Sequence, residues 1–418
     1  MTHGTPTSDD ARDPSRTDAP TRAPSDDPPP PRRRAIVAIG ATLVIAAAAV
    51  VGTRVWGTGS AAPPPTSPTT GEQSTPSAAS PVPGSALAGW PLWSTIPAAT
   101  VDLAAAPHRH VDRALAVVRT DDPSDGGGLA LFALDAADGA WVRLDLPDGV
   151  PAPGHGIALS ADGRSIASTG SGSDVQLYDL ATGGRRTVTI PPTATTGCTS
   201  TWSTFSSDGA HLAVLSTCGT ELSASAPERS TSVVEIDLTT RDVRQVALAP
   251  GTYAPPEPSL AYAPDGATIA VGTLDVGSDT DGTLTVVARD GSTLARWTGA
   301  ATLDTVDPWR DDRTVLVSGI DSTGSGTPMW FDTTTSRITP AVLAPADGDV
   351  SLTPMLFAAG MLVARIDPTT ADTPGTTVWV CDTAHGTRAP WLTFTGASVL
   401  SVLLPATPAP SRPSTSAR

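Results

Sequence analysis

Aspartate is the side chain whose placement in the sequence most suggests chemistry, because it recurs after a series of short alternating runs. Each run ends in an Asp and a polar turn, and the six residues are Asp135, Asp179, Asp237, Asp290, Asp332 and Asp382. Carboxylates that converge on one cleft could act as general acid and base or hold a metal ion. A carboxylate that returns once per repeat is better explained by hydrogen bonds to the backbone of its own turn. The pattern therefore predicts a structural role for all six.

Two further segments carry metal-ligating side chains. In "DVGSDTDGT", Asp279, Asp281 and Gly282 have the spacing of a calcium loop, but no acidic residue follows at the closing position. In "HRH", His108–His110, two imidazoles stand without the further ligands of a complete metal site. We expect no metal and no cofactor, with calcium at Asp279 and Asp281 left open.

The composition excludes several classes of protein. The 418 residues include no Lys and no Asn, which removes Schiff-base chemistry and N-glycosylation. No G-x-S-x-G motif marks a serine nucleophile. The net charge of −16 argues against a nucleic-acid partner, since such a partner requires a basic face.

A second motif repeats in step with the aspartates and defines the elements that position them. An Asp-Gly corner between two strand-like runs occurs at Asp162-Gly163, Asp208-Gly209 and Asp265-Gly266. Weaker copies fit the same frame at Asp112-Arg113, Asp312-Arg313 and Ala359-Gly360. Each unit of ~48 residues then contains four antiparallel strands, a period typical of β-propeller blades.

The repeats predict an all-β domain over residues 89–405, a β-propeller of six four-stranded blades. A pair of β-sandwiches would also contain many short strands, but would not repeat two markers in fixed order six times. One further strand, 397–405, follows the sixth unit. It could close the ring by pairing with segment 93–105, or belong to a seventh blade.

These repeats resemble those of TolB-like, WD-repeat-like β-propellers. The resemblance is carried by "LSADGRSIA" with "LYDLATG", and by "FSSDGAHLA" with "EIDLTT". It implies a periplasmic or extracellular scaffold that contacts other proteins or cell-wall material. Members known for envelope assembly carry a separate domain beside the propeller, which nothing here resembles, so that role is not transferred.

The chain contains three cysteines, Cys198, Cys218 and Cys381. If Ser207 to Gly209 form a three-residue loop, Ser206 faces Ala210 and the same count places Cys198 opposite Cys218. An exported domain is where a disulfide persists, so we predict this bond and a free thiol at Cys381.

Tryptophan is unusually frequent among the aromatic residues. Five lie on expected outer strands and are predicted to pack between blades: Trp141, Trp297, Trp330, Trp379 and Trp391. Three others, Trp90, Trp93 and Trp309, lie nearer loops and could stack on a sugar or a peptide.

The sequence before the repeats predicts a membrane anchor. Residues 1–34 have a composition typical of disorder, and the eighteen uncharged residues 35–52 are long enough to span a bilayer. Three arginines precede that segment, which places residues 1–34 in the cytoplasm as a disordered tail and the propeller outside the cell membrane. A cleaved signal peptide is the alternative. A Pro/Ser/Thr-rich linker, 53–88, precedes the domain, and a disordered tail, 406–418, follows it.

We therefore expect a non-enzymatic, single-pass membrane protein whose extracellular or periplasmic propeller binds envelope proteins or cell-wall material. The alternative is a propeller hydrolase or lyase with its site at the mouth of the central channel. Converging carboxylates and histidines at that mouth would favour the enzyme.

Overall fold

The structure is a computed structural model that divides into two units, Met1–Gln73 and Ser74–Arg418. The residues that it describes all belong to the second unit and are 90, 92, 94–122, 128–147, 150, 156–170, 172–190, 197–219, 229–255, 259–276, 282–303, 305–320, 326–341, 351–358, 360–367, 375–383 and 387–405. Within these ranges no helix is long and apolar enough to cross a membrane. The expected anchor, 35–52, and both expected disordered tails lie outside them, so these assignments remain predictions.

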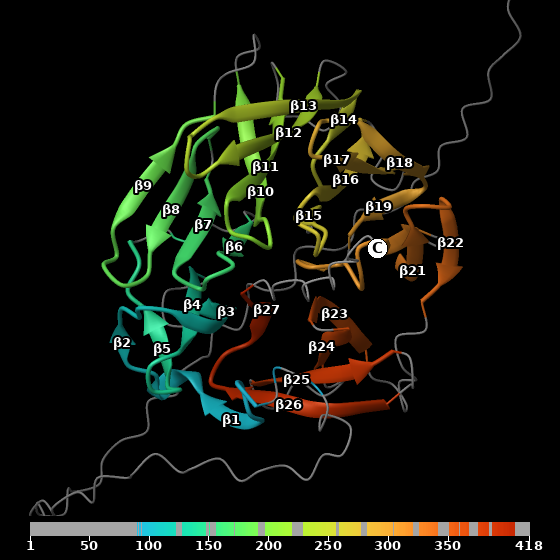
Figure 1. Ribbon diagram of the computed structural model, residues 1–418. Coiled ribbons are helices and arrows are strands. Elements are labelled where there is room, and N and C mark those ends of the chain that lie inside the picture. Colours follow the sequence, from blue (N-terminus) through green and yellow to red (C-terminus); the bar gives the residue numbers. More distant parts are fainter. Residues whose placement is uncertain are drawn as a thin grey trace, which may run out of the picture. The chain divides into compact units, whose positions relative to one another are not determined.

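Six sheets, antiparallel apart from one rim strand in each of two of them, surround a common axis and form the six blades of a β-propeller (Figure 1). Blade 2 consists of β6 (Ile157–Leu159), β7 (Ser165–Thr169), β8 (Val175–Asp179) and β9 (Arg185–Val188). Blade 3 consists of β10 (Cys198–Phe205), β11 (His211–Cys218), β12 (Ser230–Asp237) and β13 (Val243–Pro250). Blade 4 consists of β14 (Thr252–Tyr253), β15 (Leu260–Tyr262), β16 (Thr268–Asp275), β17 (Gly282–Ala288) and β18 (Thr293–Thr298). Blade 5 consists of β19 (Ala300–Thr302), β20 (Thr314–Ile320), β21 (Gly326–Asp332) and β22 (Arg337–Pro340).

Blades 1 and 6 contain strands from both ends of the domain. Blade 6 is β23 (Ser351–Ala358), β24 (Met361–Asp367), β25 (Gly375–Asp382) and β26 (Thr387–Thr395), with β1 (Ala99–Asp102) at its outer edge. Blade 1 is β3 (Ala114–Asp122), β4 (Gly128–Asp135) and β5 (Trp141–Leu144), with β27 (Val399–Leu403) inside and β2 (His108–Arg109) outside. A short 3-10 turn, η2 (Leu103–Ala105), joins β1 to β2.

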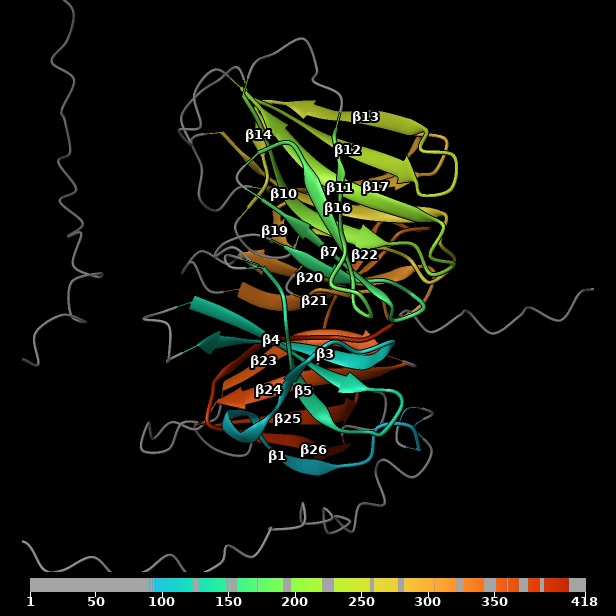
Figure 2. The same cartoon turned by 90° about the vertical axis from the view of Figure 1, so that its left-hand side faces the viewer.

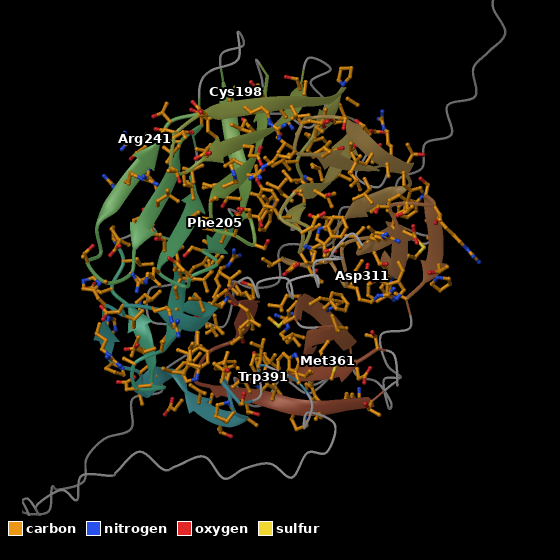
Figure 3. The ribbon with its side chains drawn as sticks, in the orientation of Figure 1. Cys198, Phe205, Arg241, Asp311, Met361 and Trp391 are labelled. Atoms are coloured by element: carbon orange, nitrogen blue, oxygen red, sulfur yellow. A yellow bond between two sulfur atoms is a disulfide. The ribbon has the colours of Figure 1, made fainter. Side chains whose placement is uncertain are left out.

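Alternation along the strands explains why the blades pack into a ring. On β11, Leu212 and Val214 belong to the apolar cluster shared with blade 2, whereas Ala213 and Leu215 belong to the cluster shared with blade 4. Successive side chains of a strand point to opposite faces, so each sheet is apolar on both faces and needs two neighbours. Six such clusters are present, one at each boundary between neighbouring blades, and the side chains fill the space between the sheets (Figure 3).

The ring is closed twice at the boundary between blades 6 and 1. Near the axis, β27 pairs antiparallel with β3, from Val399 opposite Thr120 to Leu403 opposite Val117. At the rim, β1 pairs in parallel with β26, while β2 pairs in parallel with β5 (Figures 1 and 2). The segment 99–109 therefore spans the boundary outside, and the last strand closes it inside.

This arrangement decides between the alternatives left by the sequence. The extra strand is part of blade 1, so the described residues form six blades and not seven. The suggested pairing of 397–405 with 93–105 is wrong, because each segment instead joins the blade on the opposite side of the boundary. The physical reason is that each then covers an open strand edge.

Two of the weaker corner copies were also misplaced. Asp112-Arg113 connects β2 to β3 and is not a hairpin, because the inner neighbour of β3 comes from the C-terminal end. At the corner before β20, the carboxylate in the equivalent position is Asp311, one residue before the expected Asp312. Its Oδ1 accepts hydrogen bonds from the backbone N–H groups of Arg313 and Thr314.

Candidate ligand-binding cleft

A cleft of about 490 Å³ lies where the two ends of the domain meet the start of blades 1 and 2. Its walls come from the segment before β1, the start of β3, the corner between β6 and β7 and the residues after β27. The lining residues are Leu92, Thr95, Ile96, Arg113, Ala114, Leu115, Ala161, Asp162, Arg164, Leu404 and Pro405. The size is that of ordinary small-ligand and peptide pockets.

The Asp-Gly corner of blade 2 fixes one side of this cleft. Ser160 Oγ donates to the carboxylate of Asp162 at 2.7 Å, and the backbone N–H of Arg164 donates to the same carboxylate at 3.0 Å. Gly163 closes the turn with a φ of 73°, a conformation that glycine adopts at little cost. A Cβ at this position would collide with the carbonyl oxygen of Ala114.

The same close approach brings the backbone of the two arginines together. The N–H of Ala114 donates to the carbonyl oxygen of Gly163 at 2.8 Å, and Arg113 and Arg164 are the neighbours of that bonded pair. Both side chains are exposed. No hydrogen bond or ion pair joins either guanidinium to another residue of the described chain. The cleft thus has two guanidinium groups and the Asp162 carboxylate at its polar end and mostly aliphatic side chains elsewhere. Arg164 also lies near enough to Asp179 to help lower the pKa of that carboxyl.

The other Asp-Gly corners use the same chemistry away from the cleft. Asp208 accepts from Ser206 Oγ at 2.5 Å and from the N–H of Ala210 at 2.9 Å. Burial opposes its ionisation, but these hydrogen bonds and nearby Arg289 hold the pKa of Asp208 below its usual value. Asp265 accepts from the N–H groups of Ala267 and Thr268. Gly209 and Gly266 share the positive φ of Gly163.

Among the described residues, hydrogen bonds within the turn are seen for five of the strand-end aspartates, and Asp382 has an interaction of its own. Asp237, for example, accepts from the N–H groups of Thr239 and Thr240, both at 2.8 Å. The others that do so are Asp135, Asp179, Asp290 and Asp332. Hydrogen bonds from Thr182 hold the pKa of Asp179 below its usual value, and donors in their turns do the same for Asp237, Asp290 and Asp332. Asp382 ends β25 and is half-buried.

Asp135 also forms an ion pair with a residue outside its own turn. It is almost fully buried and lies 3.0 Å from Arg109 of β2, whose other guanidinium nitrogen is 2.6 Å from Asp138. This pairing fastens the rim strand β2 to blade 1. His110, beside it, packs against Gly183 of blade 2. No group of three or more potential metal ligands occurs in the described ranges, which do not include Asp279 and Asp281.

A buried polar cluster joins blades 3 and 4. Glu235 of β12 is 6% exposed, and its carboxylate accepts from Arg244 at 2.6 Å and from the hydroxyl of Tyr262 at 2.8 Å. Arg289 approaches the same carboxylate at 3.5 Å. Burial, with nearby Glu235, raises the pKa of Tyr262. The cluster crosses the boundary between the blades and holds them in register.

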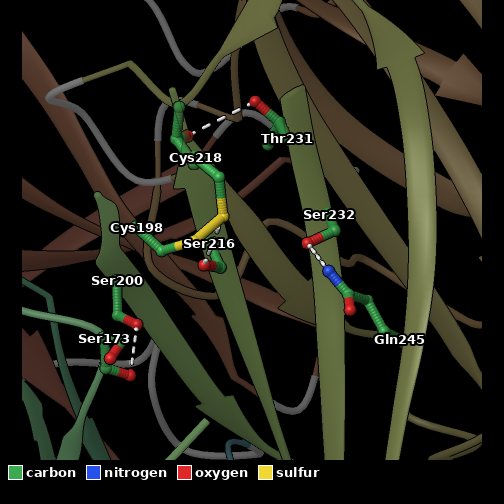
Figure 4. The surroundings of a disulfide bond; sticks show 9 residues. Ser173, Cys198, Ser200, Ser216, Cys218, Thr231, Ser232 and Gln245 are labelled. Atoms are coloured by element: carbon green, nitrogen blue, oxygen red, sulfur yellow. Dashed lines mark hydrogen bonds between the residues drawn. A yellow bond between two sulfur atoms is a disulfide. The ribbon is translucent and has the colours of Figure 1, made fainter. Parts of the chain in front are cut away.

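Cys198 and Cys218 are joined by a disulfide between the paired ends of β10 and β11 (Figure 4). The route to this pairing differs from the expected one. Ser206 pairs with His211 and not with Ala210, and a β-bulge between Ser200 and Trp202 restores the alignment. Cys381 is free and buried, and burial raises the pKa of its thiol to about 11.

The suggestion that Trp90 and Trp309 stack on a sugar or a peptide is wrong. Both rings are buried, and their indole N–H groups donate to the carbonyl oxygens of Ala358 and Ala261. Trp93 lies outside the described residues. The expected packing of Trp391 between blades is confirmed, since it is buried in the cluster shared by blades 6 and 1.

The sequence did not single out Arg113 and Arg164 as a pair. Each stands beside a corner motif, but only the contact between Ala114 and Gly163 brings the two together. Asp307 was missed as well. It lies on the inner segment that pairs with β23 through Leu356. Desolvation by the surrounding protein atoms raises the pKa of its carboxyl to about 7, although the side chain keeps an exposed surface.

No protein-family model matches this chain, and no curated protein sequence does. Solved structures that are similar to it include TolB from Acinetobacter baumannii, at 17% identity, 70% of this chain, 66% of that chain and a TM-score of 0.41. The Swd1 β-propeller domain of Myceliophteria thermophila has 17% identity, 69% and 85% coverage and a TM-score of 0.39.

Acylaminoacyl peptidase from Pyrococcus horikoshii is also similar, with 12% identity, 68% of this chain, 45% of that chain and a TM-score of 0.42. The resemblance to TolB and WD-repeat propellers is one of fold alone. The number of blades rests on the strand pairing of this chain.

Proposed function

We propose that this chain is a membrane-anchored, exported β-propeller that binds envelope proteins or cell-wall material without transforming them. The observation that carries the proposal is the cleft at the junction of the domain ends. It combines two guanidinium groups with a mostly aliphatic wall, a composition suited to binding. The repeated carboxylates are the side chains in the sequence that most suggest catalysis. Most of them instead accept hydrogen bonds within their own turns.

Localisation outside the membrane rests on the sequence of residues 32–52 and on the disulfide. Three arginines before the apolar segment orient it with the propeller on the far side. A disulfide persists in an oxidising compartment. Protease added to intact cells should digest the propeller while sparing a short N-terminal fragment. A propeller protected from protease unless the cells are lysed would contradict the proposed location.

Binding can be tested with residues 86–418, which contain every strand of the closed ring. The immobilised fragment should capture a discrete envelope protein or cell-wall fragment, and Arg113→Gln with Arg164→Gln should reduce the capture. The matched control is Arg186→Gln with Arg337→Gln, which removes the same charge from exposed positions on β9 and β22. Equal capture by both double variants would show that the cleft is not the binding site. Turnover of ester, amide or glycoside substrates by the fragment would contradict a binding-only role.

A further inference from the structure

The polar end of the cleft is built to receive an anion. Arg113 and Arg164 extend from backbone segments joined by the Ala114–Gly163 hydrogen bond. The Cγ atom of Arg113 lies 3.2 Å from the position that a Cβ on Gly163 would occupy, so its stem passes directly beside the residue that precedes Arg164. Both arginines line the cleft, and a guanidinium group offers N–H donors that match the two oxygens of a carboxylate.

The carboxylate already present in the cleft does not satisfy these arginines. Asp162 accepts from Ser160 Oγ and from the backbone N–H of Arg164, both part of its own turn. Neither arginine side chain forms an ion pair with it among the described residues. The residues that line the cleft therefore carry two positive charges and one negative charge, whereas the whole chain carries −16. Asp179, whose pKa Arg164 helps to lower, is not among the lining residues.

The rest of the wall is mostly aliphatic, and it offers more apolar surface than a single methyl group of a ligand could cover. Leu92, Leu115 and Leu404 are half-buried, and Ile96 is fully buried beneath them. An apolar side chain bound there would lose contact with water, which favours binding. A hydrated phosphate would gain nothing from this wall.

The end of a polypeptide places a carboxylate and an aliphatic side chain on the same residue, which matches both parts of the cleft. An Asp or Glu within a chain would need a separate residue to reach the wall. The last residues of this chain end in Arg418, a cation, and do not match the cleft.

We propose that the cleft binds the C-terminus of a partner protein, with the α-carboxylate on Arg113 and Arg164 and an aliphatic last side chain on Leu92, Leu115 and Leu404. This inference rests on the proposed binding function and specifies its ligand class. Capture of carboxylate ends by a receptor site is a general mode of peptide recognition.

The test uses defined peptides and residues 86–418, read by fluorescence anisotropy. The probe is an N-terminally labelled Ala-Ser-Leu-Leu with a free carboxylate, and its partner is the same peptide with a C-terminal amide. We expect the acid to bind about tenfold more tightly than the amide, as loss of a charge-assisted pair implies. Arg113→Gln with Arg164→Gln should abolish that difference, while Arg186→Gln with Arg337→Gln should retain it.

Further peptides separate this inference from the broader binding function. Equal binding of acid and amide, or binding of neither, overturns the ligand class. Preference for a peptide ending in D-alanine, or for an amidated peptide with internal Asp or phosphoserine, also overturns it. In each of these cases capture of an envelope component by the unaltered fragment would still support the proposed function, whereas its loss would contradict that function. Thermal melting of each variant checks that the ring is intact.

Discussion

Two boundaries between blades show different solutions to the same packing problem. Between blades 6 and 1, the closure boundary, the contacts are apolar and aromatic: Trp90 and Trp391 meet edge to face with centroids 4.9 Å apart, and Trp141 meets Phe394 at 5.3 Å. Blade 3, together with its boundary with blade 4, instead holds a disulfide and the ionic cluster around Glu235.

Chain connectivity explains the difference. Blades 3 and 4 follow each other in the sequence, so their association closes only a short loop. Blades 6 and 1 come from opposite ends of the domain, and loop-closure entropy makes their association costlier by about 2–3 kcal/mol. Burial of one or two large aromatic side chains offsets that amount. The boundary that chain connectivity helps least therefore has the largest apolar cluster.

The largest effect is expected at the closure boundary. Trp391 is 2% exposed, and its indole N–H donates to the carbonyl oxygen of Ile96 at 2.8 Å. Trp391→Ala should lower the free energy of unfolding in urea by about 3–5 kcal/mol, because it leaves a cavity and an unpaired carbonyl. Leu294→Ala, at a residue that is 54% exposed, should change it by less than about 0.5 kcal/mol. Similar small losses for both would contradict an apolar closure.

The disulfide should come next. Its residues are 20 positions apart, and a loop of that length corresponds to about 3 kcal/mol of stability. Cys198→Ser with Cys218→Ser should lower the free energy of unfolding by that amount. Thiol titration of the denatured, unreduced domain should find one free thiol, that of Cys381. Three thiols would show that the bond is not formed.

Loss of the buried carboxylate should have an intermediate effect. Glu235→Gln leaves Arg244 and Arg289 without their anion inside the boundary, and we expect a loss of about 2 kcal/mol in urea unfolding. Because Glu235 is buried, the loss should persist in 0.5 M salt. The exposed pair of Asp138 and Arg109 supplies the contrast, since Asp138→Asn should cause a smaller loss that 0.5 M salt largely removes. Equal losses would mean that burial of the cluster contributes nothing.

The smallest effect is expected at Asp307, between blades 5 and 6. Its pKa of about 7 exceeds that of an unfolded Asp, so the folded state binds the extra proton and stability falls as the pH rises from about 4 to 7. The side chain retains contact with solvent, which reduces the effect. Asp307→Asn should stabilise the domain by about 1 kcal/mol at pH 8 and leave it unchanged at pH 4. A gain of the same size at both pH values would contradict this assignment.

The six-bladed fold could be predicted because local turn chemistry repeats. An Asp that precedes Gly, or that ends a strand, acts through its own backbone, and the sequence displays that signal directly. How the ring closes could not be predicted in the same way. The strands β1, β2 and β27 are short, and nothing in a short apolar run specifies which distant edge it covers.

The cysteine pair illustrates a prediction that was right for an incomplete reason. The corner loop is longer than expected, which alone would misalign Cys198 and Cys218 by one residue. The bulge near Thr201 adds one residue to β10 and cancels that shift. Bulges also occur on the inner strands β19, β23 and β27 and on the outer strands β13, β18 and β26. Sequence spacing does not reveal them.

The candidate cleft was harder to predict than the fold or the disulfide. Its two arginines belong to different blades, and its aliphatic wall comes from both ends of the domain. Only the contact of Gly163 with Ala114 shows that they share one site.

The exchange of β27 into blade 1 has a consequence for the order in which the protein can fold. The strand β3 emerges early during synthesis, but its inner partner is the last strand to be made. Contacts between such distant segments form slowly, because the intervening chain must be ordered first. A nascent chain can complete blades 2 to 5 in sequence, but its first blade must wait for its last. The ring would therefore stay open until β27 has been made.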